Sequence, residues 1–283
     1  MKQGLLGILS LSLACLLIGC ASNAPKQEQM QEPKIETVED FEIAIPVRGW
    51  DDESLSPIAP SNQTGLYTGE LTDGKPSGSG KFVSENGEGL TWTYTGEFKN
   101  GTFHGQGMQV FDGDDYLKSI GTFQNGLFTP TLVELCAAMG TRENDMSFEL
   151  TNASQQFVND HKNLFPCGDA AAVQEAITLT NGDASYKAFT KNISPYTGSL
   201  YAANSLSVIQ IVENPCWGYT VTQINAMDYY GNVYYIIYNG TTDIYQGDTI
   251  NMRALPLANS SFHTTYGGVA NCVMFFGSII ERV

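Results

Sequence analysis

YTGEFKNGTFHGQGM, residues 94–108, is the stretch that decides the fold. In it, aromatic residues and glycines alternate with polar residues on both sides of the dipeptide Asn100-Gly101, as in two antiparallel strands joined by a tight turn. Asn-Gly is a strong hairpin signal because both residues tolerate the positive φ angles that a type I′ turn requires. The stretch therefore predicts a β-hairpin.

The same pattern occurs upstream at residues 67–82 and, in weaker form, downstream at residues 121–128. The spacing is 27 residues from Gly69 to Gly96 and 25 residues from Gly96 to Gly121. A period of this length with glycines in register predicts an array of stacked hairpins. The residues that define the repeat are Tyr67, Gly69, Gly74, Tyr94, Gly96, Gly101, Gly105, Gly107, Gly121 and Gly126.

These positions resemble the MORN repeat, whose pattern is Y-x-G-x-x-x-x-G-x-x-x-G-x-G. The first two copies carry the tyrosine and the glycines, whereas the third has Ser119 in place of the tyrosine and lacks the closing G-x-G, as a terminal cap would. The resemblance covers about a quarter of the chain. It implies a scaffold or contact surface rather than a catalytic site.

The aromatic side chains of the repeats have two possible roles. They either stack on one another to hold the hairpins together, or offer one face of the sheet to a partner. The residues concerned are Tyr67, Tyr94, Phe98, Phe103, Phe123 and Phe128.

The composition of the chain disfavours a nucleic-acid partner. The 283 residues carry a formal net charge of −16 with only 14 Lys and Arg, and phosphate binding depends on basic side chains. Only 16% of the residues are charged, while glycine and tyrosine are plentiful. This composition is typical of an exposed, turn-rich protein that is mainly β.

The beginning of the chain is a predicted targeting segment. Residues 1–19 have a basic Lys2 followed by an apolar run too short to span a bilayer. The run ends in Leu17-Ile18-Gly19-Cys20, which resembles a bacterial lipobox. The resemblance implies cleavage before Cys20, lipidation of that cysteine, and a location in the bacterial cell envelope, anchored to a membrane on its extracytoplasmic side. The alternative is an ordinary secretory signal.

Residues 20–63 are predicted to be a flexible acidic tether. Between residues 21 and 60 there are nine acids and three bases, without sustained apolar periodicity. Within this segment, Phe41–Val47 alternates between apolar and polar residues over part of its length and could add a strand to the first repeat.

After the repeats, at residues 64–130, the sequence predicts a helical connector and then a second β domain. Residues 131–176 suggest three short helices, the first ending at Gly140. Residues 177–283 suggest five strands and resemble an OB-like domain of bacterial secreted proteins, which implies a small closed barrel. The predicted fold class is therefore mainly β, with a MORN-like β-hairpin array, a short helical connector and a C-terminal five-stranded OB-like β-barrel.

Four cysteines remain beyond Cys20, and in an exported protein they favour two disulfides. The first choice among the three connectivities is Cys136 with Cys167 and Cys216 with Cys272. The alternative is four buried thiols.

The motifs give no support for catalysis, a metal or a cofactor. The chain has no C-x-x-C pair and no G-x-S-x-G, and its histidines, at 104, 161 and 263, are widely spaced. The acidic turn at residues 112–115 lacks the spacing of a calcium loop.

The predicted binding residues lie in and near two loops of the second β domain, at residues 213–218 and 257–268. Aromatic residues there could form a stacking platform for sugars or peptides, and the alternative is that they pack in the core. They are Trp217, Tyr219, Tyr234, Phe262 and Tyr266.

The sequence therefore predicts a non-enzymatic cell-surface lipoprotein that acts as a scaffold or an adhesion module. Its expected partners are the membrane, through the Cys20 lipid, and an envelope protein or cell-wall component. One alternative is a module that binds glycans or peptides through the barrel loops. The other is a hydrolase whose site is assembled across domains.

Overall fold

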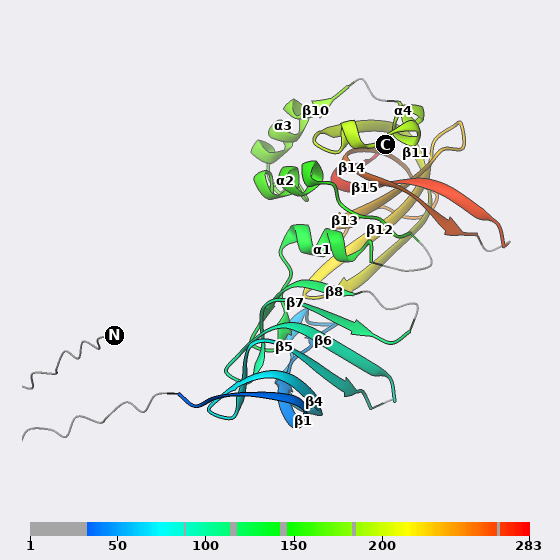
Figure 1. Cartoon of the computed structure of the whole chain (residues 1–283). Helices are drawn as coiled ribbons and strands as arrows, with labels where there is room; N and C mark the ends of the chain where they lie inside the picture. Colours follow the sequence, from blue (N-terminus) through cyan, green and yellow to red (C-terminus); the bar gives the residue numbers. More distant parts are fainter. Residues whose placement is uncertain (1–32, 88, 114–117, 142–145, 183–184, 265–266) are drawn as a thin grey trace, which may run out of the picture. The chain divides into compact units, whose positions relative to one another are not determined.

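The computed structural model describes residues 33–87, 89–113, 118–141, 146–182, 185–264 and 267–283 (Figure 1). The repeats form a seven-stranded antiparallel sheet in which each strand pairs with its neighbour along the chain, and a two-stranded ribbon lies between its first two strands in sequence. The sheet strands are β1 (Ile35–Val47), β4 (Ser61–Thr72), β5 (Lys75–Glu85), β6 (Thr91–Lys99), β7 (Thr102–Phe111), β8 (Ser119–Gln124) and β9 (Leu127–Phe128). The ribbon consists of β2 (Trp50–Asp51) and β3 (Ser56–Pro57). The predicted hairpin array is confirmed.

The hairpin turns have the predicted backbone conformation. Asn100 and Gly101 have φ angles of 55° and 86°, so both residues of the turn are in the left-handed region that a type I′ turn requires. The dipeptides Asp73-Gly74 and Asn125-Gly126 repeat this conformation at the other two turns.

The repeat tyrosines lie in the core of the sheet rather than on its surface. Tyr67 and Tyr94 are fully buried, and each hydroxyl donates a hydrogen bond of 2.9 Å to a backbone carbonyl three residues further along, that of Glu70 or Glu97. The ring of Tyr94 stacks on Phe103 with centroids 3.9 Å apart. The remaining repeat aromatics, Phe98, Phe123 and Phe128, are also buried. These side chains therefore hold the hairpins together, as the first of the two possible roles requires.

The predicted tether is wrong for residues 34–63. Strand β1 pairs with β4 from Ile35 opposite Thr72 to Val47 opposite Ser61, and Ile45 is fully buried. The strand suspected at Phe41–Val47 is confirmed and begins earlier, because backbone pairing with β4 outweighs the acidic composition of the segment. The rest of the predicted tether, residues 20–32, lies outside the described residues.

The three predicted helices are present, and each begins at a side-chain cap. They are α1 (Leu132–Ala138), α2 (Asn152–Asp160) and α3 (Ala170–Thr178), capped by Thr131, Thr151 and Asp169 respectively. Beyond them lie β10 (Thr180–Asn181), α4 (Tyr186–Lys191) and the 3₁₀ turn η1 (Ser194–Tyr196), which the sequence did not suggest.

The last part of the chain forms a sheet whose pairings close on themselves. Its strands are β11 (Leu200–Cys216), β12 (Tyr219–Met227), β13 (Val233–Asn239), β14 (Thr249–His263) and β15 (Val269–Arg282). They follow the order β11-β12-β13-β15-β14, and β14 pairs again with β11. Strands β13 and β15 are parallel, and the other pairs of this ring are antiparallel. This arrangement is compatible with the predicted small barrel.

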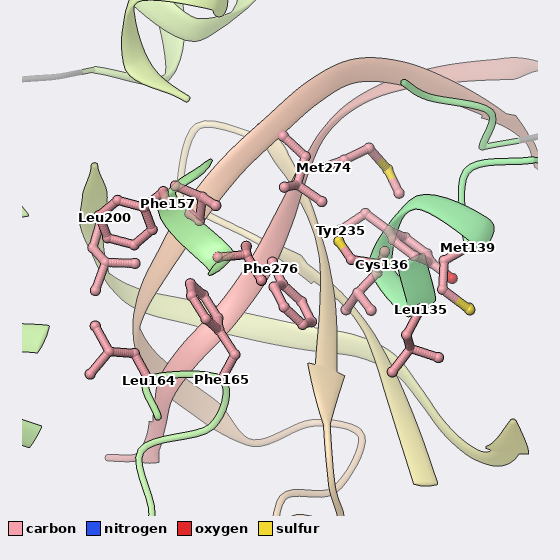
Figure 2. Packing of buried hydrophobic residues seen from close by; sticks show 14 of the residues in the cluster. Leu135, Cys136, Met139, Phe157, Leu164, Phe165, Leu200, Tyr235, Met274 and Phe276 are labelled. Carbon is pink, nitrogen blue, oxygen red and sulfur yellow. The ribbon is translucent and has the colours of Figure 1, made fainter. Parts of the chain in front are cut away.

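Both faces of the central strands are buried. Tyr234 and Phe275 belong to one apolar cluster, whereas Tyr235 and Phe276 belong to another that includes helices α1 to α3. Figure 2 shows the second cluster, in which the ring of Phe165 lies parallel to Phe276 with centroids 4.7 Å apart. In the same view, Cys136 of α1 and Met139, which directly follows the helix, lie beside Tyr235 and Met274.

The predicted disulfides are wrong, since the four cysteines of the described residues are all thiols. Cys136 is buried in the cluster of Figure 2, and the sulfur of Cys167 lies 3.3 Å from the hydroxyl of Ser278. Cys216 pairs with Tyr219 at one end of the sheet. The strand registers place Cys272 level with Met227 on β12. Met227 lies eight residues along that strand from Tyr219, a separation of about 26 Å. A disulfide requires Cα atoms within about 7 Å, so Cys216 and Cys272 lie too far apart.

Candidate functional site

A groove of about 710 Å³ runs between the repeat sheet and the turn that joins β11 to β12. This volume lies in the range of small-ligand sites, roughly 300–1,000 Å³. Its walls come from the end of β1, the segment around β2, strands β4 and β6 to β9, the loop between β5 and β6, and that turn. The aromatic residues of its lining are Trp50, Trp92, Phe111, Phe128 and Trp217.

All three tryptophans of the chain line this groove. Trp92 is buried in the floor, with only 3% of its surface exposed, and stands edge-on to Phe103 of the repeat core. Trp50 and Trp217 are half-buried and reach the groove from outside the repeats. Segments that are far apart in the sequence therefore bring their indole rings to one place.

Trp50 is held in position by two contacts. Its Nε1 donates a hydrogen bond of 2.9 Å to the backbone carbonyl of Phe128. Its ring packs so closely on Gly218 that a Cβ built there would stand 2.6 Å from the indole. The side chain is therefore fixed by the strand that ends the repeats and by the turn of the next domain.

Trp217 occupies a backbone conformation that bulky side chains avoid. It has a φ of 50° and Gly218 a φ of 82°, so the two form the turn of the β11–β12 hairpin. Asn is the usual choice at such a position, and a left-handed conformation costs an ordinary residue about 1–2 kcal/mol. The Trp217 ring stands edge-on to Phe128 with centroids 5.0 Å apart. Strained positions of this kind concentrate at functional sites.

The polar part of the lining is mostly uncharged. It contains the side-chain amides of Gln63, Asn86 and Gln109 and the hydroxyls of Ser61 and Ser119. Two charged residues complete it, Arg48 and Asp52. Arg48 Nε donates a hydrogen bond of 2.9 Å to the carbonyl of Ile58, which ties the ribbon to the end of β1.

The predicted stacking platform is not assembled. Trp217 lies in the groove, while the hydroxyl of Tyr219 donates a hydrogen bond of 3.1 Å to the carbonyl of Pro130. Tyr234 is 7% exposed and stacks on Phe275, so it packs in the core, as the alternative required. Phe262 packs on the cluster of Figure 2, and Tyr266 lies outside the described residues. Of the predicted binding residues that the structure describes, Trp217 is the one that lines the groove.

Trp50, Trp92 and Phe111 were missed as binding residues. Trp50 fell in the predicted tether, and the other two read as strand residues within the repeats. The signal that could have found the two tryptophans is the scarcity of tryptophan in this chain together with its absence from the repeat pattern. The sequence gives no comparable signal for Phe111.

The strongest arrangement for catalysis lies elsewhere, at the end of α2. His161 Nδ1 lies 2.8 Å from Glu175 Oε1, and the amide of Asn163 donates to the other carboxylate oxygen at 2.9 Å. The bonds from Asn163 and then His161 lower the pKa of Glu175. Nearby, burial is the largest cause of a raised pKa at Cys167, and the charge of Glu175 adds to it. The Cys167 thiol is therefore kept protonated, which disfavours it as a nucleophile.

The described ranges hold no group of three or more His, Cys, Asp or Glu placed to bind a metal ion. His104 lies in β7, where its backbone carbonyl accepts a hydrogen bond of 3.3 Å from Tyr94. Of the acidic turn at 112–115, Asp114 and Asp115 lie outside the described residues. No helix in the described part of the chain is long and apolar enough to cross a membrane.

Comparison with known families supports the repeats. The family model of the MORN repeat matches residues 67–89 and 94–115, which contain the hairpins built on Tyr67 and Tyr94. The chain therefore contains MORN repeats, and the third hairpin extends their sheet beyond the matched residues. No curated protein and no solved structure matches the chain.

Proposed function

We propose that this chain is a non-enzymatic recognition module of the bacterial envelope, anchored to a membrane through lipidated Cys20. It scaffolds, or adheres to, an envelope component that occupies the groove. The observation that carries the proposal is the convergence of Trp50, Trp92 and Trp217 on one groove, with Trp217 held there in a strained turn. MORN repeats suggest a module for protein interaction or membrane binding, which agrees with a role in recognition.

The two ends of β1 have different surroundings. The chain enters the folded unit at Ile35, whereas the groove begins at Val47, at the other end of the strand. At about 3.3 Å per residue, roughly 40 Å of strand separates the two. The point where the chain enters the sheet is therefore separated along β1 from the residues that line the groove.

We also propose that the closed sheet is an OB-like barrel. The ring β11-β12-β13-β15-β14, with its single parallel pair β13–β15, supports this assignment. The barrel presents Trp217 to the groove from the tip of its first hairpin. It therefore supplies one wall of the groove and not a second binding site.

Co-sedimentation with isolated envelope from a bacterium that produces the protein tests the proposal. The chain from residue 21 onward is suitable, since it retains the whole folded unit Lys34–Val283. The informative variant is Trp217→Asn, because asparagine suits the left-handed turn and removes only the ring. Its control is Tyr229→Asn in the β12–β13 turn, where the ring is 95% exposed and outside the groove.

We expect the parent chain and Tyr229→Asn to sediment with the envelope and Trp217→Asn to remain in the supernatant. Equal sedimentation of all three proteins would show that the groove does not mediate binding.

A further inference from the structure

We infer that the groove binds a neutral oligosaccharide. This inference rests on the proposed function and specifies the ligand of the same site. It is carried by the chemistry of the lining, by the way Trp50 is fixed, and by the pairing of the strands beneath the groove.

The half-buried Trp50 can offer its ring to a ligand but not its N–H group. Trp50 Nε1 is already bonded to the carbonyl of Phe128, so what remains available at this residue is the ring. The face of an aromatic ring is electron-rich. The C–H groups on one side of a pyranose ring are apolar and slightly positive, and they pack flat on such a face. Trp50 and Trp217, both half-buried, have the surface for this contact.

The polar groups of the lining complement sugar hydroxyls. A side-chain amide both donates and accepts hydrogen bonds, as a hydroxyl does. Gln63 and Gln109 are half-buried in the lining, on strands β4 and β7. Gln63 Nε2 already donates a hydrogen bond of 3.2 Å to Ser61, which steadies the amide. Amides placed beside aromatic faces can therefore bind the polar edge of a sugar while the rings bind its apolar side.

The charges of the groove favour a neutral ligand. Arg48 and Asp52 balance each other, and Arg48 Nε is engaged with Ile58. The chain as a whole carries a formal charge of −16, which repels a polyanion. A polycation is disfavoured because the lining offers it a single carboxylate, that of Asp52.

The backbone of the groove disfavours an extended peptide. Peptides commonly bind sheets by adding a strand to a free edge. In the described sheet, β6 and β7 under the groove are paired on both sides. At β9 the carbonyl of Phe128 is occupied by Trp50. Recognition must therefore come from side chains, which suits a ligand that has hydroxyls and ring faces in place of a peptide backbone.

Intrinsic fluorescence provides a direct test, because every tryptophan of the chain lines the groove. The chain from residue 21 onward would be titrated with cellotetraose, maltotetraose and the N-acetylglucosamine tetramer. Tetragalacturonate serves as the anionic comparison and a pool of neutral tetrapeptides as the peptide comparison. We expect a saturable fluorescence change with at least one neutral sugar and none with the anion or the peptides.

The variants locate the binding. Removing one amide contact in Gln109→Ala should raise Kd about threefold to tenfold. Trp217→Asn should abolish the change, and Tyr229→Asn should leave Kd unaltered. Thermal unfolding of each variant tests whether the fold is retained. If no neutral sugar gives a saturable change, or if only the peptides do, the inference is overturned. If envelope sedimentation still depends on Trp217, the proposed function then stands without the sugar. If neither sugar binding nor sedimentation that depends on Trp217 is found, both the inference and the proposed function are wrong.

Discussion

The ring of Tyr94 lies directly over Gly107, so that a Cβ built on the glycine would stand 2.6 Å from Cε2 of the tyrosine. Tyr67 and Gly80 repeat the relationship in the first hairpin at 2.7 Å. This contact explains why the tyrosine and the closing glycine recur together. The aromatic ring needs the space that a side chain would fill.

Gly107→Ala should therefore destabilise the repeat sheet. Forcing one methyl group into a packed core typically costs about 1–3 kcal/mol. Denaturant unfolding of the chain from residue 21 onward measures the loss. Gly168→Ala is the matched control, since a Cβ there meets nothing within 4 Å. Equal stability of the two variants would contradict the packing described for Tyr94.

Gly74→Ala isolates the cost of backbone conformation. Gly74 has a φ of 75°, and a Cβ there also meets nothing within 4 Å. Any destabilisation must then come from the left-handed conformation, which costs an alanine about 1–2 kcal/mol. The same unfolding measurement applies, and a loss much smaller than 1 kcal/mol would show that the turn relaxes to another type.

The carboxylate of Glu134 should make the free energy of unfolding depend on pH in the acidic range. Burial acts to raise its pKa, but hydrogen bonds from the Thr131 N–H, the Thr122 hydroxyl and the Gln106 amide outweigh it, so the pKa is lowered from 4.5. A carboxylate with a lowered pKa stabilises the fold above its unfolded-state pKa, and this contribution is lost as pH falls through the folded-state pKa.

In Glu134→Gln the free energy of unfolding should be lower at pH 7, and it should fall less than in the parent chain as pH drops below about 4.5. Unfolding curves between pH 7 and pH 3 compare the two proteins. An unchanged acid dependence would show that the bonds to Glu134 do not matter for stability.

Cys20→Ala should release the protein from the membrane. Two acyl chains are sufficient for stable anchoring, and the variant lacks the cysteine that is proposed to carry them. Fractionation of cells that produce the full chain, with detection in the membrane and soluble fractions, gives the answer. Continued membrane association of the variant would refute the lipid anchor.

The features predicted correctly are those that depend on residues close together in the sequence. The Asn100-Gly101 turn and the spacing of the repeat glycines depend on contacts within one hairpin or its neighbour. The first helix could be predicted for the same reason, because its cap at Thr131 and its apolar positions lie within one short stretch.

The features that were missed depend on distant partners. The acidic composition of residues 34–63 concealed the first part of β1, before Phe41, whose pairing partner is β4. Tyr234 could not be assigned to the core from sequence because β13 is buried on both faces, so alternation gives no sign of an exposed side. The groove joins Trp50, Trp92 and Trp217 from three segments, and no local pattern brings them together.

Photocrosslinking in cells that produce the full chain tests the central claim most directly. A benzophenone amino acid at Ser61, an exposed position on the wall of the groove, should form an adduct with an envelope component. The same group at Tyr229, exposed but remote from the lining, should form none. Adducts at Tyr229 but not at Ser61, or none at either position, would contradict recognition through the groove.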